Sequence, residues 1–413
     1  ELQILTMAVI AKFKALRPVR DKVHLVATRP YYSYKKNVLK AKMETNPWTL
    51  LNIINPEFDH SKKTKANSTE RFELVKKGYD QFVQDGILIQ DAEPKLYLYK
   101  QTSEKHSCIG VIAGASVEEY LAKKIKIHEA TLTTREAIFE HYLDVVGYNA
   151  EPVLLSYSGN KNIQNLIQEI ALSRPEYEFT TTDKIKHELW IVQSDDADKI
   201  QAYFEPIKEV YIADGHHRSA SSAGLYKSKK NQYEHSKNFL AYFVDEQQLN
   251  IISFNRIIRS LNNLNPETFL AEISKLGTIE KLDQGLPPAF NHTLHFLISD
   301  TWYALTIDEN LIDENHPVKC LDSSLLTELI LKPILGIEDL KTSKEVDFLP
   351  GTFDAEAFAQ ELKNKKFVLG IMLFPVSISQ IKAVADAGLY MPPKSTWVEP
   401  KLRSGLTIYN LKE

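Results

Sequence analysis

The sequence predicts a mixed α/β protein of the α+β class, with a large N-terminal domain on a mixed sheet, residues 7–245, and a smaller α+β C-terminal domain, residues 246–413. Three observations support this fold class. A chain of 413 residues is too long for one ordinary core, so two domains are expected. Apolar runs of strand length alternate with amphipathic helical patterns. Two such runs, residues 95–100 and 108–114, are joined by a short polar link, and the antiparallel hairpin that they predict excludes a purely parallel sheet.

Composition limits the function. Hydrophobic residues make up 43% of the chain and charged residues 25%, which is typical of a globular protein rather than a disordered or membrane protein. A net charge of -4 argues against a protein that coats nucleic acid. Cys108 and Cys320 supply no disulfide framework, no apolar run reaches the roughly 18 residues that span a bilayer, and the N-terminus lacks a signal-peptide pattern. We therefore expect a cytoplasmic protein with small-molecule partners and no nucleic-acid or membrane partner, in an oligomeric state that the sequence leaves open.

The N-terminal domain begins with short elements. Apolar residues 8–16 and 23–27 predict two strands. Residues 34–44 predict a helix that ends before Pro47, because proline disfavours helix in the residue that precedes it. Residues 48–54 predict a buried strand.

Polar residues that precede amphipathic patterns mark three helix starts. Ser68 precedes a pattern whose apolar residues share one face and which ends at Gly86. Ser116 and Thr133 are each followed by a glutamate at the third position, which is the spacing of a capping box. Between the last two helix starts lies a loop-like segment, residues 125–131.

The remaining elements follow from the same patterns. In the N-terminal domain, strands are predicted at residues 151–157, 177–181, 187–192 and 238–244, and helices at residues 163–172 and 197–204. In the C-terminal domain, the predicted elements are helices at residues 266–276, 323–333, 355–362 and 377–387, a hairpin of residues 294–299 with 302–307, and a strand at residues 366–373.

The strongest functional pattern is a short apolar run that breaks at an Asp-Gly pair, meets two histidines and an arginine, and continues into a helix rich in small residues. These five residues are Asp214, Gly215, His216, His217 and Arg218. The pattern predicts a buried strand that ends in a tight turn, where glycine permits close backbone approach and the next helix points its first N–H groups outward. Such a turn is suited to bind an anion.

The chemistry of the turn fits a phosphate. The amides after Gly215 and the guanidinium of Arg218 can bind oxygens, and one of the two histidines can add a donor. Asp214 can hold Mg²⁺ or act as a base on a hydroxyl. In the alternative interpretation, Asp214 is an N-cap, one histidine is a core residue and Arg218 is a surface partner. Five such residues in one turn after a buried strand favour a functional site.

A second candidate lies in the loop-like segment, where His128 and Glu129 stand between two capped helices. They can supply a general base or two metal ligands. Alternatively, Glu129 interacts with the following helix and His128 is exposed. His216 and His217 are adjacent and point apart on a helix, so both cannot easily bind one metal and zinc is disfavoured.

The C-terminal domain carries further polar candidates. Lys394 and Ser395 follow two prolines and form a basic, hydroxyl-bearing loop that can close over an anion. Lys401 and Arg403 extend the polar character, although a charged tail is more often solvated surface. Arg256 can contact a ligand or lie at a domain interface, but a single arginine is not by itself a functional signal.

Several stretches carry a chain-long resemblance. They are residues 13–18, 46–47, 94–97, 126–131, 213–218, 240–242, 255–256, 385–388 and 391–396. Together and in order, they resemble the domain-of-unknown-function family 1015 of bacteria and archaea. The chain departs from that family at Tyr32, because the family commonly reads Pro-Tyr-Asp where this chain has Pro-Tyr-Tyr. If the aspartate of the family pattern has a role, that role is absent in this chain or is taken by another residue.

A second resemblance is local. Asp214, Gly215, His217 and Arg218 form the pattern Asp-Gly-x-His-Arg before a helix. This pattern resembles the phosphate-binding turn of free-serine kinases and other proteins of the ParB and sulfiredoxin fold, which implies that the turn meets nucleotide phosphates. In those kinases a glutamate elsewhere in the chain serves as base, and Glu129 is the candidate here on chemical grounds.

These patterns lead to one hypothesis and two alternatives. The hypothesis is a nucleotide-dependent phosphotransferase, or kinase, that acts on a small hydroxylated metabolite such as free L-serine, with ATP or ADP as donor and Mg²⁺ bridging the phosphates. It assigns catalysis to Asp214, Glu129 and His217, cofactor binding to Gly215, His216, His217, Arg218, Lys394 and Ser395, and metal binding to Asp214. The alternatives are a non-catalytic regulatory protein that binds a nucleotide or metabolite, and a metal-dependent hydrolase that uses His128, Glu129 and one of the paired histidines.

Overall fold

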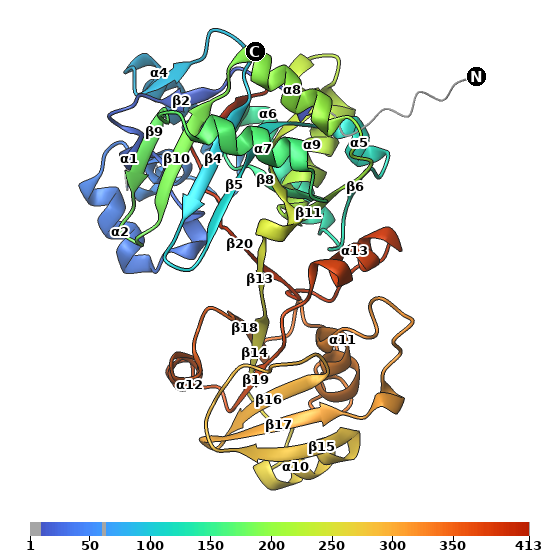
Figure 1. Ribbon diagram of the computed structural model, residues 1–413. Coiled ribbons are helices and arrows are strands. Elements are labelled where there is room, and N and C mark those ends of the chain that lie inside the picture. The colour runs from blue at the N-terminus through green and yellow to red at the C-terminus, as the bar shows by residue number, and fades with distance from the viewer. Residues whose placement is uncertain (1–9, 60–62, 413) are drawn as a thin grey trace. The chain divides into compact units, whose positions relative to one another are not determined.

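The computed structural model of the chain describes residues 10–59 and 63–412, and Figure 1 traces its elements. By packing, the chain divides into two compact units. Of the described residues, the first unit takes 10–127, 131–249 and 400–412, and the second unit takes 128–130 and 250–399. In this division the C-terminal segment returns to the first unit, whereas the predicted second domain includes it.

The first unit is built on a mixed sheet, which confirms the predicted fold class. The strands are β1 (Ile10–Ala11), β4 (Tyr97–Thr102), β5 (Ser107–Ser116), β6 (Ile125–Lys126), β8 (Val153–Tyr157), β9 (Tyr177–Thr180), β10 (Lys186–Ile191), β11 (Val210–Asp214) and β12 (Asn238–Asp245). Within the described residues their order is β6-β11-β8-β12-β5-β4-β10-β9, with β1 paired to β5 outside this path. β12 runs parallel to β8, and β11 runs parallel to β6, while the other pairs are antiparallel. The predicted hairpin is present as β4 and β5.

Helices share a core with this sheet (Figure 1). α7 (Lys161–Ala171), α8 (Ser194–Phe204) and α9 (His216–Lys229) all contribute apolar side chains to it. Val111 and Ala113 of β5 belong to the same cluster, because alternate residues of a strand point to one face of a sheet. The strand that carries the Asp-Gly turn and the helix that follows it are therefore anchored in one core.

A second apolar cluster packs the N-terminal helices of the first unit, and Ile408 of the C-terminal segment belongs to it. The remaining helices of the first unit are α1 (Val23–Val26), α2 (Lys36–Thr45), α3 (Leu50–Ile54), α4 (Thr69–Gln84), α5 (Val117–Leu121) and α6 (Thr133–Val146), with 3-10 turns η1 (Tyr31–Ser33), η2 (Pro56–Phe58), η3 (Glu234–Lys237) and η4 (Glu246–Gln248). Of these, α1, α3, α4 and α6 contribute residues to the second cluster, whereas Val117 of α5 belongs to the first. Two small ribbons pair β2 (Leu16–Pro18) with β3 (Leu88–Gln90) and β7 (Tyr148–Asn149) with β21 (Tyr409–Asn410). None of the described helices of the chain is long and apolar enough to span a membrane.

Two of the three predicted helix starts carry the expected caps. The Ser68 hydroxyl accepts a hydrogen bond from the Arg71 amide at 3.3 Å, and the Ser116 hydroxyl accepts one from the Glu119 amide at 3.3 Å. At α6 the N-cap position is Leu132, one residue earlier than predicted, so the third helix starts without a side-chain cap.

Two predicted strands are wrong. Residues 23–27 contain α1, and residues 48–54 contain α3. The Thr49 hydroxyl accepts a hydrogen bond from the Leu51 amide at 3.4 Å and caps α3. An apolar run of about five residues fits a short helix as well as a buried strand, so periodicity cannot separate the two.

Two other segments differ in detail from their prediction. Of the strand predicted at residues 8–16, the described part forms β1 and an isolated bridge between Phe13 and Lys95, while residues 8 and 9 lie outside the described residues. The segment predicted as a loop at 125–131 starts with β6, because Ile125 pairs with β11.

The second unit is built on an antiparallel sheet. Its strands are β14 (Phe254–Ile258), β15 (Gly277–Leu282), β16 (Thr293–Ile298), β17 (Thr301–Ile307), β18 (Val346–Pro350) and β19 (Leu369–Met372), in the order β15-β17-β16-β19-β14-β18. α10 (Pro266–Ile273), α11 (Asp322–Leu326) and a π-helical turn η7 (Thr327–Leu331) share one apolar cluster with the sheet, and α12 (Ala355–Asn364) shares another. The unit also contains α13 (Ile378–Asp386), the 3-10 turns η5 (Ser274–Leu276) and η6 (Glu309–Leu311), and a ribbon of β13 (Asn250–Ile252) with β20 (Trp397–Glu399). Residues 128–130 join this unit, where the Met391 amide donates a hydrogen bond to the His128 carbonyl at 2.8 Å.

Asp322 begins α11 with its carboxylate almost fully buried. Oδ1 accepts a hydrogen bond from the His292 amide at 2.8 Å, and Oδ2 has no hydrogen-bond partner among the described residues. Burial raises the pKa of this carboxyl to about 6, although the bond from His292 acts in the opposite direction. The charged form therefore destabilises the folded protein at neutral pH.

We expect Asp322→Asn to raise the free energy of unfolding by up to about 3 kcal/mol near pH 7.5, since a shift of about two units costs about 1.4 kcal/mol per unit. The folded pKa lies above the usual value of 3.8, so the destabilisation of the wild type is present above about pH 6 and disappears as the pH falls below that usual value. Urea unfolding at about pH 7.5 and about pH 4 measures both values. Asp283→Asn, at an exposed position of the same unit, is the matched control, and an equal loss of stability at both pH values in Asp322→Asn would contradict the expectation.

Candidate functional site

The Asp-Gly turn stands at the end of β11. Val210 and Ile212 fix this strand in the core, and the strand lies between β6 and β8. Its register with β8 shifts between Ile212 and Asp214, and such an irregularity changes the direction in which a strand presents its side chains. The strand therefore presents the Asp214 side chain, which is one-third exposed, at its terminus.

Gly215 is required at this turn for two reasons. Its φ of +108° lies in the left-handed region, which side chains with a Cβ rarely adopt. A Cβ at this position would also lie 3.1 Å from the guanidinium carbon of Arg218. Glycine thus permits both the turn and the close approach of Arg218 to the backbone.

α9 begins directly after Gly215. Its N-cap residue, Gly215, has no side chain to cap the helix, and the first turn contains His216, His217 and Arg218 but no acidic residue. The first amides of a helix have no partner within the helix and carry partial positive charge. His216 is buried, whereas His217 and Arg218 are half-buried. The start of α9 therefore combines a positive helix end with side chains that suit an anion.

Arg218 holds several oxygen atoms at the turn. Its Nη1 lies 3.2 Å from a carboxylate oxygen of Glu151 and donates a hydrogen bond to the Pro152 carbonyl, and its Nη2 lies 3.8 Å from the Asp214 carboxylate. Glu151 and Pro152 lead into β8, so two neighbouring strands position these partners. Glu151 is not among the predicted site residues, because a lone glutamate before a strand carries no functional signal.

Lys401 reaches the turn from the C-terminal segment. Its Nζ donates a hydrogen bond to Oδ2 of Asp214 at 3.0 Å, across a separation of 187 residues. Burial acts to raise the pKa of the Asp214 carboxyl, but the charges of Lys401 and Arg218 outweigh it and lower this pKa to about 2. Asp214 is therefore a carboxylate at neutral pH and a weak proton acceptor.

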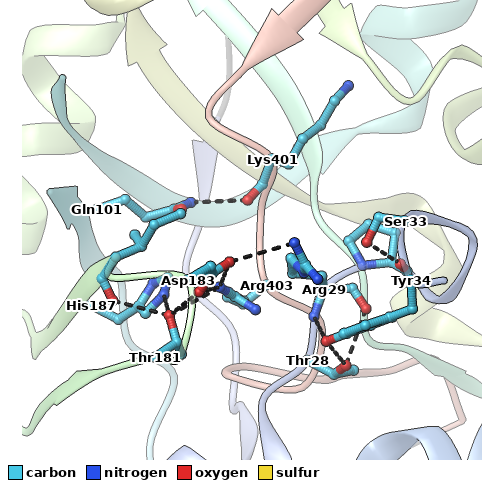
Figure 2. A network of polar contacts seen from close by, with 12 residues as sticks. Thr28, Arg29, Ser33, Tyr34, Gln101, Thr181, Asp183, His187, Lys401 and Arg403 are labelled. Carbon is cyan, nitrogen blue, oxygen red and sulfur yellow. Dashed lines mark hydrogen bonds and ion pairs between the residues drawn. The ribbon is translucent and has the colours of Figure 1, made fainter. Parts of the chain in front are cut away.

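Arg403, from the same segment, is buried in a polar network (Figure 2). Its Nη2 donates hydrogen bonds to both carboxylate oxygens of Asp183, at 2.9 and 2.8 Å, and to the Thr181 hydroxyl at 3.1 Å. Arg29 approaches the same carboxylate at 3.7 Å. Figure 2 shows the Lys401 side chain pointing away from this network, so one short segment serves two polar clusters of the first unit.

His187 is the uncharged member of the network. Burial, together with the charge of Arg403, lowers the pKa of His187 to about 3. The Thr181 hydroxyl donates to Asp183, so Nε2–H of His187 donates to Thr181 at 3.3 Å and Nδ1 accepts from the Tyr99 hydroxyl at 2.8 Å. The neutral imidazole therefore bridges two hydroxyl groups without adding charge beside Arg403.

Three predicted site residues belong to the second unit: Glu129, Lys394 and Ser395. Lys394 is exposed and has a φ of +57°. The Ser395 hydroxyl is buried and donates a hydrogen bond to the Pro392 carbonyl at 2.7 Å. The Asp-Gly turn belongs to the first unit, so the participation of these three residues at the turn stays a prediction.

The residues that the structure describes contain no group of three or more His, Cys, Asp or Glu arranged to hold a metal ion. A single ionised carboxylate such as Asp214 remains compatible with Mg²⁺, because Mg²⁺ is commonly held by one or two carboxylates together with phosphates and water.

The fold and the turn define a mixed α+β protein in which a strand of the main sheet passes through a glycine into the start of a helix. The chain belongs to the family described as "Protein of unknown function (DUF1015)", which matches residues 10–324 and confirms the predicted membership. No curated protein matches the chain.

Several solved structures are similar in fold. SbnI with a C-terminal truncation, from Staphylococcus aureus, is 12% identical over 72% of this chain and 87% of that chain, with a TM-score of 0.39. A conserved hypothetical protein from Pyrococcus furiosus is 13% identical over 73% of this chain and 95% of that chain, with a TM-score of 0.36. A mutant of free serine kinase in complex with ADP is 12% identical over 73% of this chain and 92% of that chain, with a TM-score of 0.35. Free serine kinase, which the turn resembles in sequence, is thus among the similar structures.

Replacing Lys401 with methionine should raise the pKa of Asp214 above about 2. The substitution removes the cation that lowers this pKa most, whereas the burial of the carboxyl, which raises the pKa, remains. Carbon-detected NMR of the aspartate side chains, followed as a function of pH, measures this pKa. Lys227→Met, at an exposed position in the last turn of α9, is the matched control and should leave the value unchanged. An unaltered pKa of Asp214 in Lys401→Met would show that Lys401 does not set its charge state.

Proposed function

We propose that the chain is a nucleotide-dependent phosphotransferase that acts on a small hydroxylated metabolite, with free L-serine as the first candidate acceptor. The observation that carries the proposal is the start of α9 at Gly215, where helix amides, Arg218 and Lys401 gather at one turn. Phosphoryl transfer depends mainly on positioning and on stabilisation of charge. A helix start with fixed cations supports both.

Arg218 is the proposed anchor for the nucleotide phosphates. Its guanidinium already holds the carboxylates of Glu151 and Asp214, and the same planar set of donors suits phosphate oxygens. Gly215 keeps the backbone open to the phosphates, and His217, which is half-buried, adds a donor at their edge. Phosphate oxygens would replace the Glu151 carboxylate on Arg218.

Asp214 suits Mg²⁺ better than it suits proton transfer. A carboxylate with a pKa of about 2 is ionised at any working pH and binds a hard cation well. A general base works best when its pKa lies near the working pH. Bound Mg²⁺ would neutralise charge on the phosphates, and Asp214 would hold both the ion and the Lys401 ammonium.

The proton of the substrate hydroxyl needs another acceptor. Glu129 is the proposed base, on the resemblance of the turn to that of free-serine kinases, in which a glutamate elsewhere in the chain takes this role. Glu151 is the second choice, because its carboxylate is held 3.2 Å from Arg218 and so stands beside the turn.

A non-catalytic sensor of a nucleotide or metabolite is the second candidate function. Asp214 is compatible with this role, because a carboxylate with a pKa of about 2 binds cations well and protons poorly. Both candidates use the same phosphate contacts, and they differ in whether a product forms.

Purified protein with Mg²⁺, either ATP or ADP, and a panel of amino acids and sugars should yield a phosphorylated product, which mass spectrometry detects. L-serine is the first acceptor to test, with L-threonine and L-alanine as its matched pair, since only alanine lacks the hydroxyl. Nucleotide binding without product from any acceptor would support the sensor instead. Absence of both binding and product would contradict both candidates.

Arg218→Ala should lower kcat/KM by about 10²–10³-fold, the usual effect of removing one fixed donor to a developing negative charge. Titration calorimetry should show weaker nucleotide binding as well. Gly215→Ala should produce the same defect, because its Cβ would meet the Arg218 guanidinium. Arg174→Ala, at an exposed arginine of the same unit, should retain activity and binding. If Arg218→Ala binds the nucleotide as tightly as the wild type, the turn does not bind the nucleotide phosphates as proposed.

A further inference from the structure

Arg256 is a buried cation in the second unit. It lies in β14, between β19 and β18, and its side chain is fully buried, with 0% exposure. Its cross-strand neighbours are Ile371 and Phe348, which are apolar. A guanidinium in the middle of a sheet destabilises the fold unless its charge is compensated.

Only part of the donor capacity of Arg256 is used. Nη1 donates to the Phe254 carbonyl, and Nη2 donates to the Pro393 carbonyl at 3.5 Å, the outer limit of a hydrogen bond. Among the described residues, Nε is buried without a partner. Burial lowers the pKa of Arg256 to about 9, and no acidic group of the described residues acts against this shift. The side chain is therefore still charged at neutral pH, and no carboxylate of the part of the chain that the structure describes pairs with it.

A second cation lies on the same aromatic pair. The guanidinium carbon of Arg256 is 5.3 Å from the centre of the Phe348 ring, and Nζ of Lys394 is 5.4 Å from the centre of the Phe254 ring. The two rings are in contact, with centroids 6.0 Å apart. Both cations therefore lie against one pair of contacting rings, and an anion that binds both would reduce the repulsion between them.

The loop that covers Arg256 borders an open cleft. Pro393 contacts Arg256 through its carbonyl and also lines a cleft of about 810 Å³, which is formed entirely by the second unit. Ser324 lines the same cleft, and its buried hydroxyl has no partner among the described residues. The wall of the cleft therefore carries a hydroxyl group whose hydrogen-bonding capacity is unused among the described residues.

We propose that Arg256 and Lys394 form an anion-binding site in the second unit, beneath the Pro393 loop that borders this cleft, and that the site takes the phosphate or carboxylate group of a small molecule. The anion would displace the Pro393 carbonyl from Arg256, reach Nε, and accept from the Lys394 ammonium. The site is built from residues of the second unit, so it assigns Lys394 a role there in place of the role predicted for it at the Asp-Gly turn, and it does not depend on the proposed phosphotransferase activity.

A purely structural arginine would behave differently. If Arg256 served only to fasten the Pro393 loop, then removing its charge would lower stability and would leave anion binding unchanged. If Arg256 instead binds an anion, then its charge is uncompensated in the anion-free protein. Arg256→Met keeps much of the side-chain length and removes that buried charge. The anion-free protein would then unfold at the same temperature or higher, and anion binding would be lost.

The test uses the full chain carrying Arg218→Ala, so that the turn of the first unit does not contribute. Inorganic phosphate and succinate are the probes, and titration calorimetry measures their affinity. One of them should bind, and adding Arg256→Met should weaken it by about tenfold or more, as expected for loss of a charge-assisted contact. Tighter binding of phosphate would identify a phosphate group as the ligand, and tighter binding of succinate would identify a carboxylate.

Two further variants keep the test decisive. Lys394→Met changes an exposed side chain, so it should fold normally and weaken the same probe several-fold without altering the unfolding temperature. Arg259→Met removes an exposed arginine just beyond β14 and should leave the affinity unchanged. The proposal is overturned if neither probe binds, or if Lys394→Met and any folded Arg256→Met bind the probe as tightly as the parent protein.

Discussion

The ion pair between Asp214 and Lys401 joins the end of β11 to the C-terminal segment, and the candidate site of the first unit depends on it. Burial acts to raise the pKa of the Asp214 carboxyl, and the adjacent cations outweigh it and lower this pKa to about 2. Because Lys401 comes from the C-terminal segment, the low pKa of Asp214 depends in part on the folding of that segment onto the first unit.

That segment is a structural part of the first unit rather than a charged tail. Ser404 exchanges backbone hydrogen bonds with Thr28, at 3.1 and 2.8 Å, and Arg403 is fixed by Asp183. Lys401 stands two positions before Arg403, so the backbone that the network holds in place also sets where the Lys401 ammonium can reach. The polar network and the turn are thereby coupled through a few residues of main chain.

Local features of the sequence predicted the turn well, and distant pairings could not be predicted. The apolar run of β11, Gly215 and the small residues of α9 are neighbours in the chain, so their pattern contains the strand, the turn and the helix together. The sequence predicts strands at the positions of α1 and α3, because an apolar run of about one helical turn is too short to show a helical periodicity. The burial of Arg403 follows from Asp183, a partner far away in sequence, and charge alone favours a solvated position for such a residue.

Two buried arginines, Arg403 and Arg256, differ in how their charges are compensated, and this difference indicates a structural role for the first and a binding role for the second. Arg403 is 5% exposed and holds both oxygens of Asp183, so its charge is balanced within the fold. Arg256 is more deeply buried, yet among the described residues its donors find only carbonyl oxygens. Carbonyl dipoles compensate a full charge only in part, whereas an anion compensates it completely. A fold that accepts this imbalance in the middle of a sheet is explained more simply by a ligand that supplies the missing charge than by the weak contact to Pro393.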